Sequence, residues 1–325
     1  MKKIILFVLI AVLFVTPITF LSSKQPVSAQ SISNYDASVK QGEIVKVTNT
    51  LLNSEIKNAD IEMIDTYYNH LTAEVKQLEQ SIGRVPGSTK RKKLADTYLV
   101  PAKVTIERVI YEVSQYRLML QISDSIGNGE IEKAESNMMK LERLKKRAVM
   151  IKQAGGYEEL PFAINIRLRQ NEAILQGDIL YLRVYPYRVA IDAGNLNEYV
   201  NGLYDDITKQ LKLTEQRIGQ VPGHERRSEL NKFYVKPTKE IIERTIYEIS
   251  QYRILALITN DLEKLDMESV KKRFETLNRL KDRAAKIKDA GDYDPLPVEI
   301  EEFLRAKEYE LLNPIKASKV EENQP

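Results

Sequence analysis

The second half of the chain repeats the first. Residues 79–161 and 215–297 align without a gap at a constant offset of 136 residues, and roughly 37 of about 83 aligned positions are identical. A repeat of this length means that one folded unit is present twice, so the architecture of one copy predicts that of the other. The shared residues include no recognised catalytic motif, and the repeat therefore constrains the fold more than the function.

The first 29 residues have the pattern of a signal peptide. Two lysines precede an apolar run at residues 4–21, and Val27-Ser28-Ala29 supplies the small residues that a signal peptidase needs. A proline interrupts the apolar run, which favours cleavage after Ala29 over an uncleaved transmembrane anchor. We therefore expect a secreted chain that begins at Gln30 and makes no stable membrane insertion after cleavage.

The composition excludes some classes of protein. The chain contains no cysteine, so disulfides cannot stabilise it outside the cell. Its formal net charge is +3, and the three lysines before residue 30 account for this excess, which leaves the mature chain close to neutral. Because nucleic-acid-binding proteins normally carry a clear basic excess, we expect no nucleic-acid partner.

Charge is nevertheless sorted along the chain. Residues 140–152 contain six lysines and arginines against a single acid, and residues 271–288 are also strongly basic. Residues 299–322 are rich in glutamate. The sequence therefore predicts two basic helices and an acidic C-terminal end.

The secondary structure is predicted to be almost wholly helical. Strong helix formers dominate, and apolar residues recur at spacings of three and four. In the first copy we expect helices at about 60–82, 88–125 and 130–154, and the second copy repeats this plan. Residues 35–58 and 161–193 supply a further helix ahead of each unit.

Glycine and proline mark the breaks between these helices. Val85-Pro86-Gly87 and its counterpart at residues 221–223 predict turns, and a stop is expected at Gly291. Pro101 and Pro237 fall inside or at the start of the long helices, so each is expected to kink or divide its helix.

These patterns predict an all-α protein. Each copy is expected to form a long antiparallel bundle of the three-helix type, and two tandem bundles would form an elongated rod. We place the first bundle repeat at residues 30–161 and the second, with its acidic end, at residues 162–325. Because the chain has no Gly/Ser-rich or Pro-rich linker, the bundles are expected to share a helix that runs from Pro161 to about Tyr185.

Cationic side chains flank the apolar stripe of the third helix in each copy. They are Arg143, Lys145 and Arg147 in the first copy, and Arg279, Lys281 and Arg283 in the second. Long cationic side chains can cover the edge of a core and pair with neighbouring acids. They can also form an anion-binding groove, because two arginines one turn apart present paired forks for carboxylate or phosphate oxygens. Both interpretations stay open.

The long helix carries the most closely shared sequence. One stripe combines a guanidinium, an aromatic ring and an amide, and its members are Arg108, Tyr111 and Gln115, with Arg244, Tyr247 and Gln251 in the second copy. Such a stripe could stack on a sugar and hydrogen-bond to it, or the tyrosines could belong to the core. Arg117 falls on the apolar face, where we expect a half-buried ion pair with a glutamate.

No motif for catalysis, metal binding or cofactor binding is present. The two histidines, His70 and His224, do not occupy equivalent positions in the two copies. Carboxylates are abundant, as on any charged helix, and give no specific support to a glycosidase. We expect no catalytic residue, no metal and no cofactor.

Part of the chain resembles a known family. The run Ile126-Gly127-Asn128-Gly129-Glu130-Ile131, the basic segment 141–147 and Ala154-Gly155-Gly156-Tyr157 are similar to the helical wall-binding region of SbsC-type Gram-positive S-layer proteins. The resemblance implies triple-helical bundles that bind an anionic secondary cell-wall polysaccharide through basic and aromatic side chains. The binding residues would be Arg143, Lys145 and Arg147 with their counterparts Arg279, Lys281 and Arg283. Lattice formation is not expected, because the β-sandwich domains of those proteins have no counterpart here.

The sequence therefore predicts a secreted, non-catalytic protein of the cell wall or extracellular space whose partner is an anionic cell-wall glycan. One alternative is an extracellular structural or protein-interaction spacer. Another is a secreted hydrolase or helical toxin. The identity of the glycan, the oligomeric state and the number of copies that bind stay open.

Overall fold

The computed structural model describes residues 33–291 and 293–322, and that part of the chain forms nine continuous helices and no strand. Two of the nine are interrupted by a π-helical turn. The helices are α1 (Asn34–Asn58), α2 (Ile61–Gly83), α3–η1–α4 (Ser88–Leu94, Ala95–Leu99, Val100–Gly127), α5 (Ile131–Gly155), α6 (Phe162–Asp192), α7 (Glu198–Gly219), α8–η2–α9 (His224–Leu230, Asn231–Val235, Lys236–Glu263), α10 (Met267–Gly291) and α11 (Val298–Glu322).

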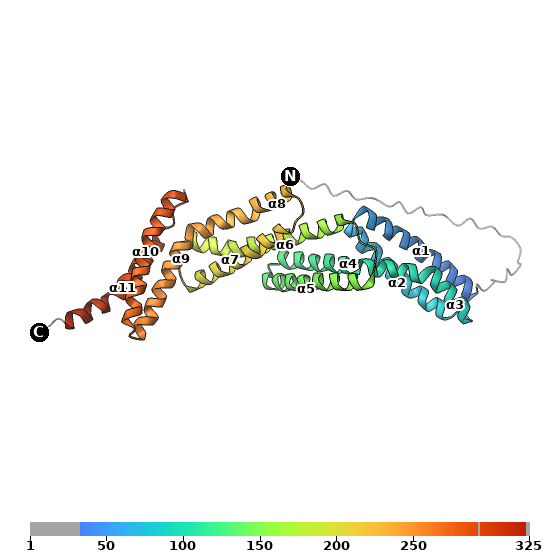
Figure 1. Cartoon of the computed structure of the whole chain (residues 1–325), viewed down its shortest axis with the longest axis horizontal. Coiled ribbons are helices and arrows are strands. Elements are labelled where there is room, and N and C mark those ends of the chain that lie inside the picture. The colour runs from blue at the N-terminus through green and yellow to red at the C-terminus, as the bar shows by residue number, and fades with distance from the viewer. Residues whose placement is uncertain (1–32, 292, 323–325) are drawn as a thin grey trace, which may run out of the picture.

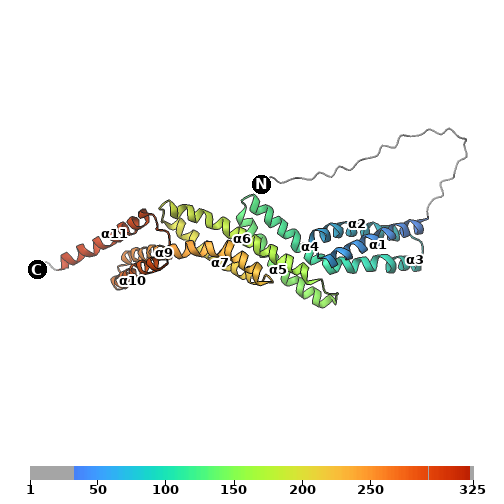
Figure 2. The ribbon, with the colours of Figure 1, turned by 90° about the horizontal axis from the view of Figure 1, so that it is seen from above.

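The helices form an elongated rod of overlapping three-helix bundles, with α1 to α3 at one end and α10 and α11 at the other (Figures 1 and 2). The long helix α3–η1–α4 packs first with α1 and α2, and further along with α5 and α6. The later part of α6 packs with α7 and with α8–η2–α9, and α9 then packs with α10 and α11. Each long helix therefore belongs to two successive bundles.

The all-helical rod of tandem bundles predicted from the sequence is confirmed. The grouping within each copy is finer than expected, because α2 packs with α1 whereas α5 packs with α6. The shared helix expected after Pro161 is present as α6. The division at residues 161 and 162 stays a prediction, and the signal peptide lies outside the described residues.

The buried apolar side chains form two clusters that meet on α6. The first extends from Val45 to Ile179, and the second from Ala173 to Leu304. Ala173 and Ile179 are fully buried although they belong to different clusters. The core of the first copy therefore continues into that of the second without an exposed linker.

The two Val-Pro-Gly turns have the same geometry. Gly87 and Gly223 have φ values of 90° and 91°, a backbone region that favours glycine. In each copy an arginine donates a 2.9 Å hydrogen bond from Nη1 to the carbonyl oxygen of the turn valine, Arg91 to Val85 in the first copy and Arg227 to Val221 in the second. The repeat therefore preserves the turn together with the side chain that closes it.

The irregularity expected at the prolines takes the form of a π-helical turn. Proline has no backbone N–H, and its ring clashes with the carbonyl group four residues earlier in a regular α-helix. The turn ahead of Pro101 is widened, and the N–H of Val100 bonds to the carbonyl oxygen of Ala95. The same arrangement joins Lys236 to Asn231 ahead of Pro237. The long helices thus remain continuous.

Each π-helical turn places a tyrosine ring against a glycine of the neighbouring helix. A Cβ atom built on Gly42 would lie 2.5 Å from Cδ2 of Tyr98, and one built on Gly177 would lie 2.6 Å from Cδ2 of Tyr234. The Tyr98 hydroxyl donates a 2.7 Å hydrogen bond to Glu43, and this bond, together with burial, raises the pKa of Tyr98. Tyr234 donates a bond of the same length to an aspartate of α6.

We expect Gly42→Ala and Gly177→Ala each to destabilise the protein by about 1–3 kcal/mol, because the added methyl group would overlap a packed tyrosine ring. Gly202→Ala is the matched control. Gly202 lies within α7, and no neighbouring atom lies within 4 Å of its added Cβ, so its replacement should stabilise the helix by about 0.5–1 kcal/mol. Urea unfolding measures all three, and a neutral Gly42→Ala would contradict the close packing.

A buried cluster of charges joins the two copies. Glu172 on α6 is only 1% exposed, and its carboxylate bonds to Lys145 of α5 at 2.9 and 3.0 Å and to Arg169. Arg217 of α7 lies 3.2 Å from Glu172 and donates a 2.7 Å hydrogen bond to Glu142. Burial alone would raise the pKa of Glu142, but Lys145 and Arg217 outweigh burial and hold that pKa below its usual value.

A second polar contact lies beside this cluster. Glu135 of α5 accepts hydrogen bonds from Arg183 of α6 at 3.0 Å and from Gln210 of α7 at 2.8 Å. Gln210 in turn accepts a 2.8 Å bond from Gln176 of α6. The three helices α5, α6 and α7 are thus held together where the two copies meet.

We expect Glu172→Gln to destabilise the protein by about 3–5 kcal/mol, because the change leaves three cations around a neutral amide in a buried site. The matched control is Glu268→Gln, which removes an exposed ion pair with Lys272 and should change stability by less than about 0.5 kcal/mol. Thermal and urea unfolding compare the two. Equal effects would mean that the charge cluster contributes nothing to the joint.

Candidate functional site

Arg143 and Arg147 lie on the solvent-exposed face of α5. Neither makes an ion pair with any described residue. Helical spacing places three further exposed side chains on the same face, namely Met139, Lys146 and Met150. Met139 and Met150 are 64% and 63% exposed. The face therefore combines three cations with apolar surface and is bordered by no acid between residues 139 and 150 except the inward-paired Glu142.

The corresponding face of α10 has a different charge. Arg279 and Arg283 are exposed there, and Arg279 bonds only to the hydroxyl of Thr276, at 3.1 Å. Glu275 and Asp282 occupy the positions that Met139 and Lys146 hold in α5, as the repeat offset shows. The two arginines of α10 are therefore set among acids, whereas those of α5 are not.

The two predicted lysines point inward. Lys145 bonds to Glu172 and, at 3.1 Å, to Glu142. Lys281 pairs with Glu308 of α11. The structure thus separates the basic residues of each third helix into exposed arginines and an internally paired lysine. A role of either lysine in binding stays a prediction.

The predicted arginines of the long helices hold the loops that follow α5 and α10. Arg108 donates to the backbone carbonyls of residues 158 and 159 at 2.9 and 2.8 Å. Arg244 donates to those of residues 294 and 295 at 2.9 and 2.7 Å, and also to Asp192 at 3.0 Å. Both guanidinium groups therefore fix the chain before the next helix begins.

The rest of the predicted stripe does not form one continuous exposed surface. Tyr111 and Tyr247 are half-buried. Gln115 is buried and accepts a 2.6 Å hydrogen bond from Arg169. Gln251 is also buried but makes no hydrogen bond to a described residue. Sugar binding by these residues stays a prediction.

The ion pair expected at Arg117 is present, but its partner is an aspartate. Arg117 bonds to Asp65 and to the side-chain oxygen of Asn69, each at 2.5 Å, and lies over the ring of Tyr68. The prediction of a glutamate was wrong because the partner comes from α2, and helical periodicity within one helix does not identify residues on another. Arg253 repeats the arrangement with α7.

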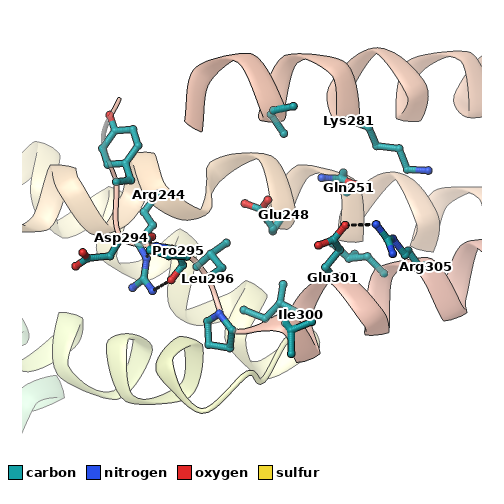
Figure 3. A pocket seen from close by; sticks show the side chains of 16 residues that line it. Arg244, Glu248, Gln251, Lys281, Asp294, Pro295, Leu296, Ile300, Glu301 and Arg305 are labelled. Atoms are coloured by element: carbon teal, nitrogen blue, oxygen red, sulfur yellow. Dashed lines mark hydrogen bonds and ion pairs between the residues drawn. The ribbon is translucent and has the colours of Figure 1, made fainter. Parts of the chain in front are cut away.

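A pocket of about 710 Å³ opens in the C-terminal bundle. It is lined by α9, α10, α11 and the loop before α11, and it brings together three of the predicted site residues, Arg244, Gln251 and Lys281 (Figure 3). Apolar side chains of the loop and of α11 complete the wall, among them Leu296 and Ile300. Tyr247, Arg279 and Arg283 do not line this pocket.

Several residues of these surfaces were missed from sequence. Met139 and Met150 fall on the same helical face as Arg143, and spacings of four and seven could have revealed it. Glu301 and Arg305 of α11 also line the pocket. No sequence pattern signals them, because their position depends on how far α11 lies from α10.

Two further features of residues 33–291 and 293–322 concern the type of protein. None of their helices combines the length and apolar composition that crossing a membrane requires. No group of three or more histidine, cysteine, aspartate or glutamate side chains is arranged there to hold a metal ion.

The tandem helical bundles and their basic faces agree with the one comparison that gives a match. The family model for the SbsC C-terminal domain matches residues 22–103 and 127–239, which is more than half of the chain. No curated protein and no solved structure matches significantly. This domain is a region of an S-layer protein, which implies a structural role at the cell surface. The chain belongs to the SbsC C-terminal domain family.

Proposed function

We propose that this protein is a secreted, non-catalytic module that binds an anionic cell-wall glycan, and that the exposed basic face of α5 is its main contact. The observation that carries the proposal is the pair Arg143 and Arg147, which lie one turn apart, exposed and without an ion-pair partner among the described residues. Two such guanidinium groups can each form bidentate hydrogen bonds with carboxylate or phosphate oxygens of a polymer.

The surroundings of the pair support this proposal. Lys146 adds a third cation, and the exposed side chains of Met139 and Met150 can contact the apolar faces of sugar rings. The inward pairing of Lys145 keeps Glu142 and Glu172 neutralised inside the bundle, so these acids do not repel a polyanion at the outer face. Arg279 and Arg283 offer a second, weaker contact on the same rod, and two contacts on one polymer would raise the apparent affinity through effective concentration.

A spacer that binds other proteins is the second candidate function. The shared helices α4, α6 and α9 favour it, because continuous helices transmit position along a rod better than flexible linkers do. Both functions are compatible with a structural family of the cell surface.

We expect Arg143→Glu/Arg147→Glu to weaken binding to cell-wall sacculi by about tenfold or more, because the change replaces two attractive charges by two repulsive ones. Co-sedimentation of residues 30–325 with purified sacculi measures the loss. The matched control is Lys209→Glu/Lys212→Glu, which reverses two exposed, unpaired cations on α7. Equal losses in the two variants would indicate diffuse electrostatics rather than a binding face.

Sacculi extracted with acid to remove the secondary polymer provide the control for the ligand. Binding to intact sacculi only would support the glycan proposal. Absence of binding to both preparations would contradict it and favour the spacer. Binding should also weaken as salt is raised, because exposed charges are screened over about 8 Å at physiological ionic strength.

We expect Arg279→Glu/Arg283→Glu to weaken binding less than the change on α5. Glu275 and Asp282 already reduce the positive potential around these arginines. The same co-sedimentation assay, with affinity measured for each double variant, tests the difference. A larger loss for α10 than for α5 would contradict the proposed order of the two faces.

A further inference from the structure

The pocket of the C-terminal bundle has a counterpart in the first copy that the chain itself fills. There Arg169 reaches between the helices and donates a 2.6 Å hydrogen bond from Nη2 to the side-chain oxygen of Gln115. The same guanidinium pairs with Glu172, which is also bound by Lys145. An arginine is therefore the natural occupant of this position in the repeat.

The second copy contains the same acceptors but not the same occupant. Gln251 and Glu308 are the counterparts of Gln115 and Glu172, and Arg305 is the counterpart of Arg169. Arg305, however, is directed away from the pocket centre, is 72% exposed and pairs with Glu301 (Figure 3). The position that a guanidinium fills in the first copy is thus left open in the second.

The acceptors left behind are buried and incompletely bonded. Gln251 is 7% exposed, lines the pocket and makes no hydrogen bond to a described residue. Glu308 retains its pair with Lys281, whereas Glu172 is contacted by three cations. A buried amide without a partner is costly, since it has lost its hydrogen bonds to water. The site therefore favours a ligand that donates hydrogen bonds.

The separation of α10 and α11 keeps the pocket open. In the first copy α6 packs on both α4 and α5, and α7 closes the charge cluster through Arg217. In the second copy α11 packs mainly on α9. Ala284 of α10 faces Ile300 and Leu304 of α11 across the pocket, and together they offer an apolar wall for the methylene groups of a long side chain.

We propose that this pocket is a receptor for an arginine side chain presented by a partner protein. The guanidinium would occupy the position of Arg169 in the first copy and donate to the side-chain oxygen of Gln251 and to the carboxylate of Glu308. The cations already present do not prevent this, because Arg244 is engaged with backbone carbonyls and Lys281 with Glu308. The site is separate from the proposed glycan face, which lies on α5.

The test titrates residues 30–325 with acetyl-arginine methylamide and follows the methyl NMR signals of Ala284, Ile300 and Leu304. The citrulline analogue is the matched control, because it has nearly the same shape and no charge. We expect saturable shifts with the arginine probe and binding at least about tenfold weaker with the citrulline probe, since hydrogen bonds to charged groups are the stronger ones. Equal binding of the two probes would overturn the proposal.

Variants test the same site independently. Gln251→Leu should weaken arginine binding by about tenfold, whereas Gln121→Leu, at an exposed position of α4, should not change it. Arg305→Ala removes the chain's own competing guanidinium and should bind the probe at least as tightly as the parent protein. Failure of both the parent protein and Arg305→Ala to bind, or shifts with a neutral disaccharide but not with arginine, would overturn the proposal.

The glycan assay separates this inference from the proposed function. Gln251→Leu should leave sacculus binding unchanged, because Gln251 lies on α9 and the proposed glycan contact lies on α5. Arg143→Glu/Arg147→Glu should in turn leave the arginine titration unchanged. Loss of both activities in either variant would mean that the two sites are not separate, and would overturn the assignment of the pocket.

Discussion

The sharing of long helices between successive bundles is the constraint on which the rest of this structure depends. Each of the long helices has to bury apolar side chains in two bundles, so it cannot end or bend sharply where one bundle gives way to the next. The π-helical turns meet this requirement at Pro101 and Pro237, because they accommodate the proline without breaking the helix. The tyrosine and glycine pairs then fix the depth at which the neighbouring helix packs.

The two copies share a sequence pattern but occupy different surroundings. In the first copy Lys145, Arg169 and Arg217 converge on Glu172, and the last of these cations comes from α7 of the following copy. The second copy repeats the lysine, one arginine and the glutamate, but it has no described equivalent of α7 beside them. A buried carboxylate needs several partners to offset its lost hydration, so the same residues give a closed cluster in one bundle and an open pocket in the other.

Much of the fold was predictable from particular residues, and less of the site was. The Val-Pro-Gly turns, the glycine-rich breaks and the apolar spacing located the helices to within a few residues. The sequence also identified the basic third helices, but it could not tell Arg143 from Lys145. Four-residue spacing predicts which side chains share a face, yet exposure depends on the neighbouring helices. The role of Arg108 as a loop clamp depends in the same way on where α6 begins.

The sequence by itself determined that this protein is helical and built from two copies of one unit, because periodicity and turn residues act over short stretches of chain. It also determined that the face of α5 is basic while the whole chain is nearly neutral. Only the tertiary structure decided which cations are exposed, that Arg117 pairs with Asp65, and that Arg169 points inward while Arg305 points outward. These outcomes depend on contacts between residues distant in the sequence, and on how closely each helix approaches its neighbours, which no local pattern encodes.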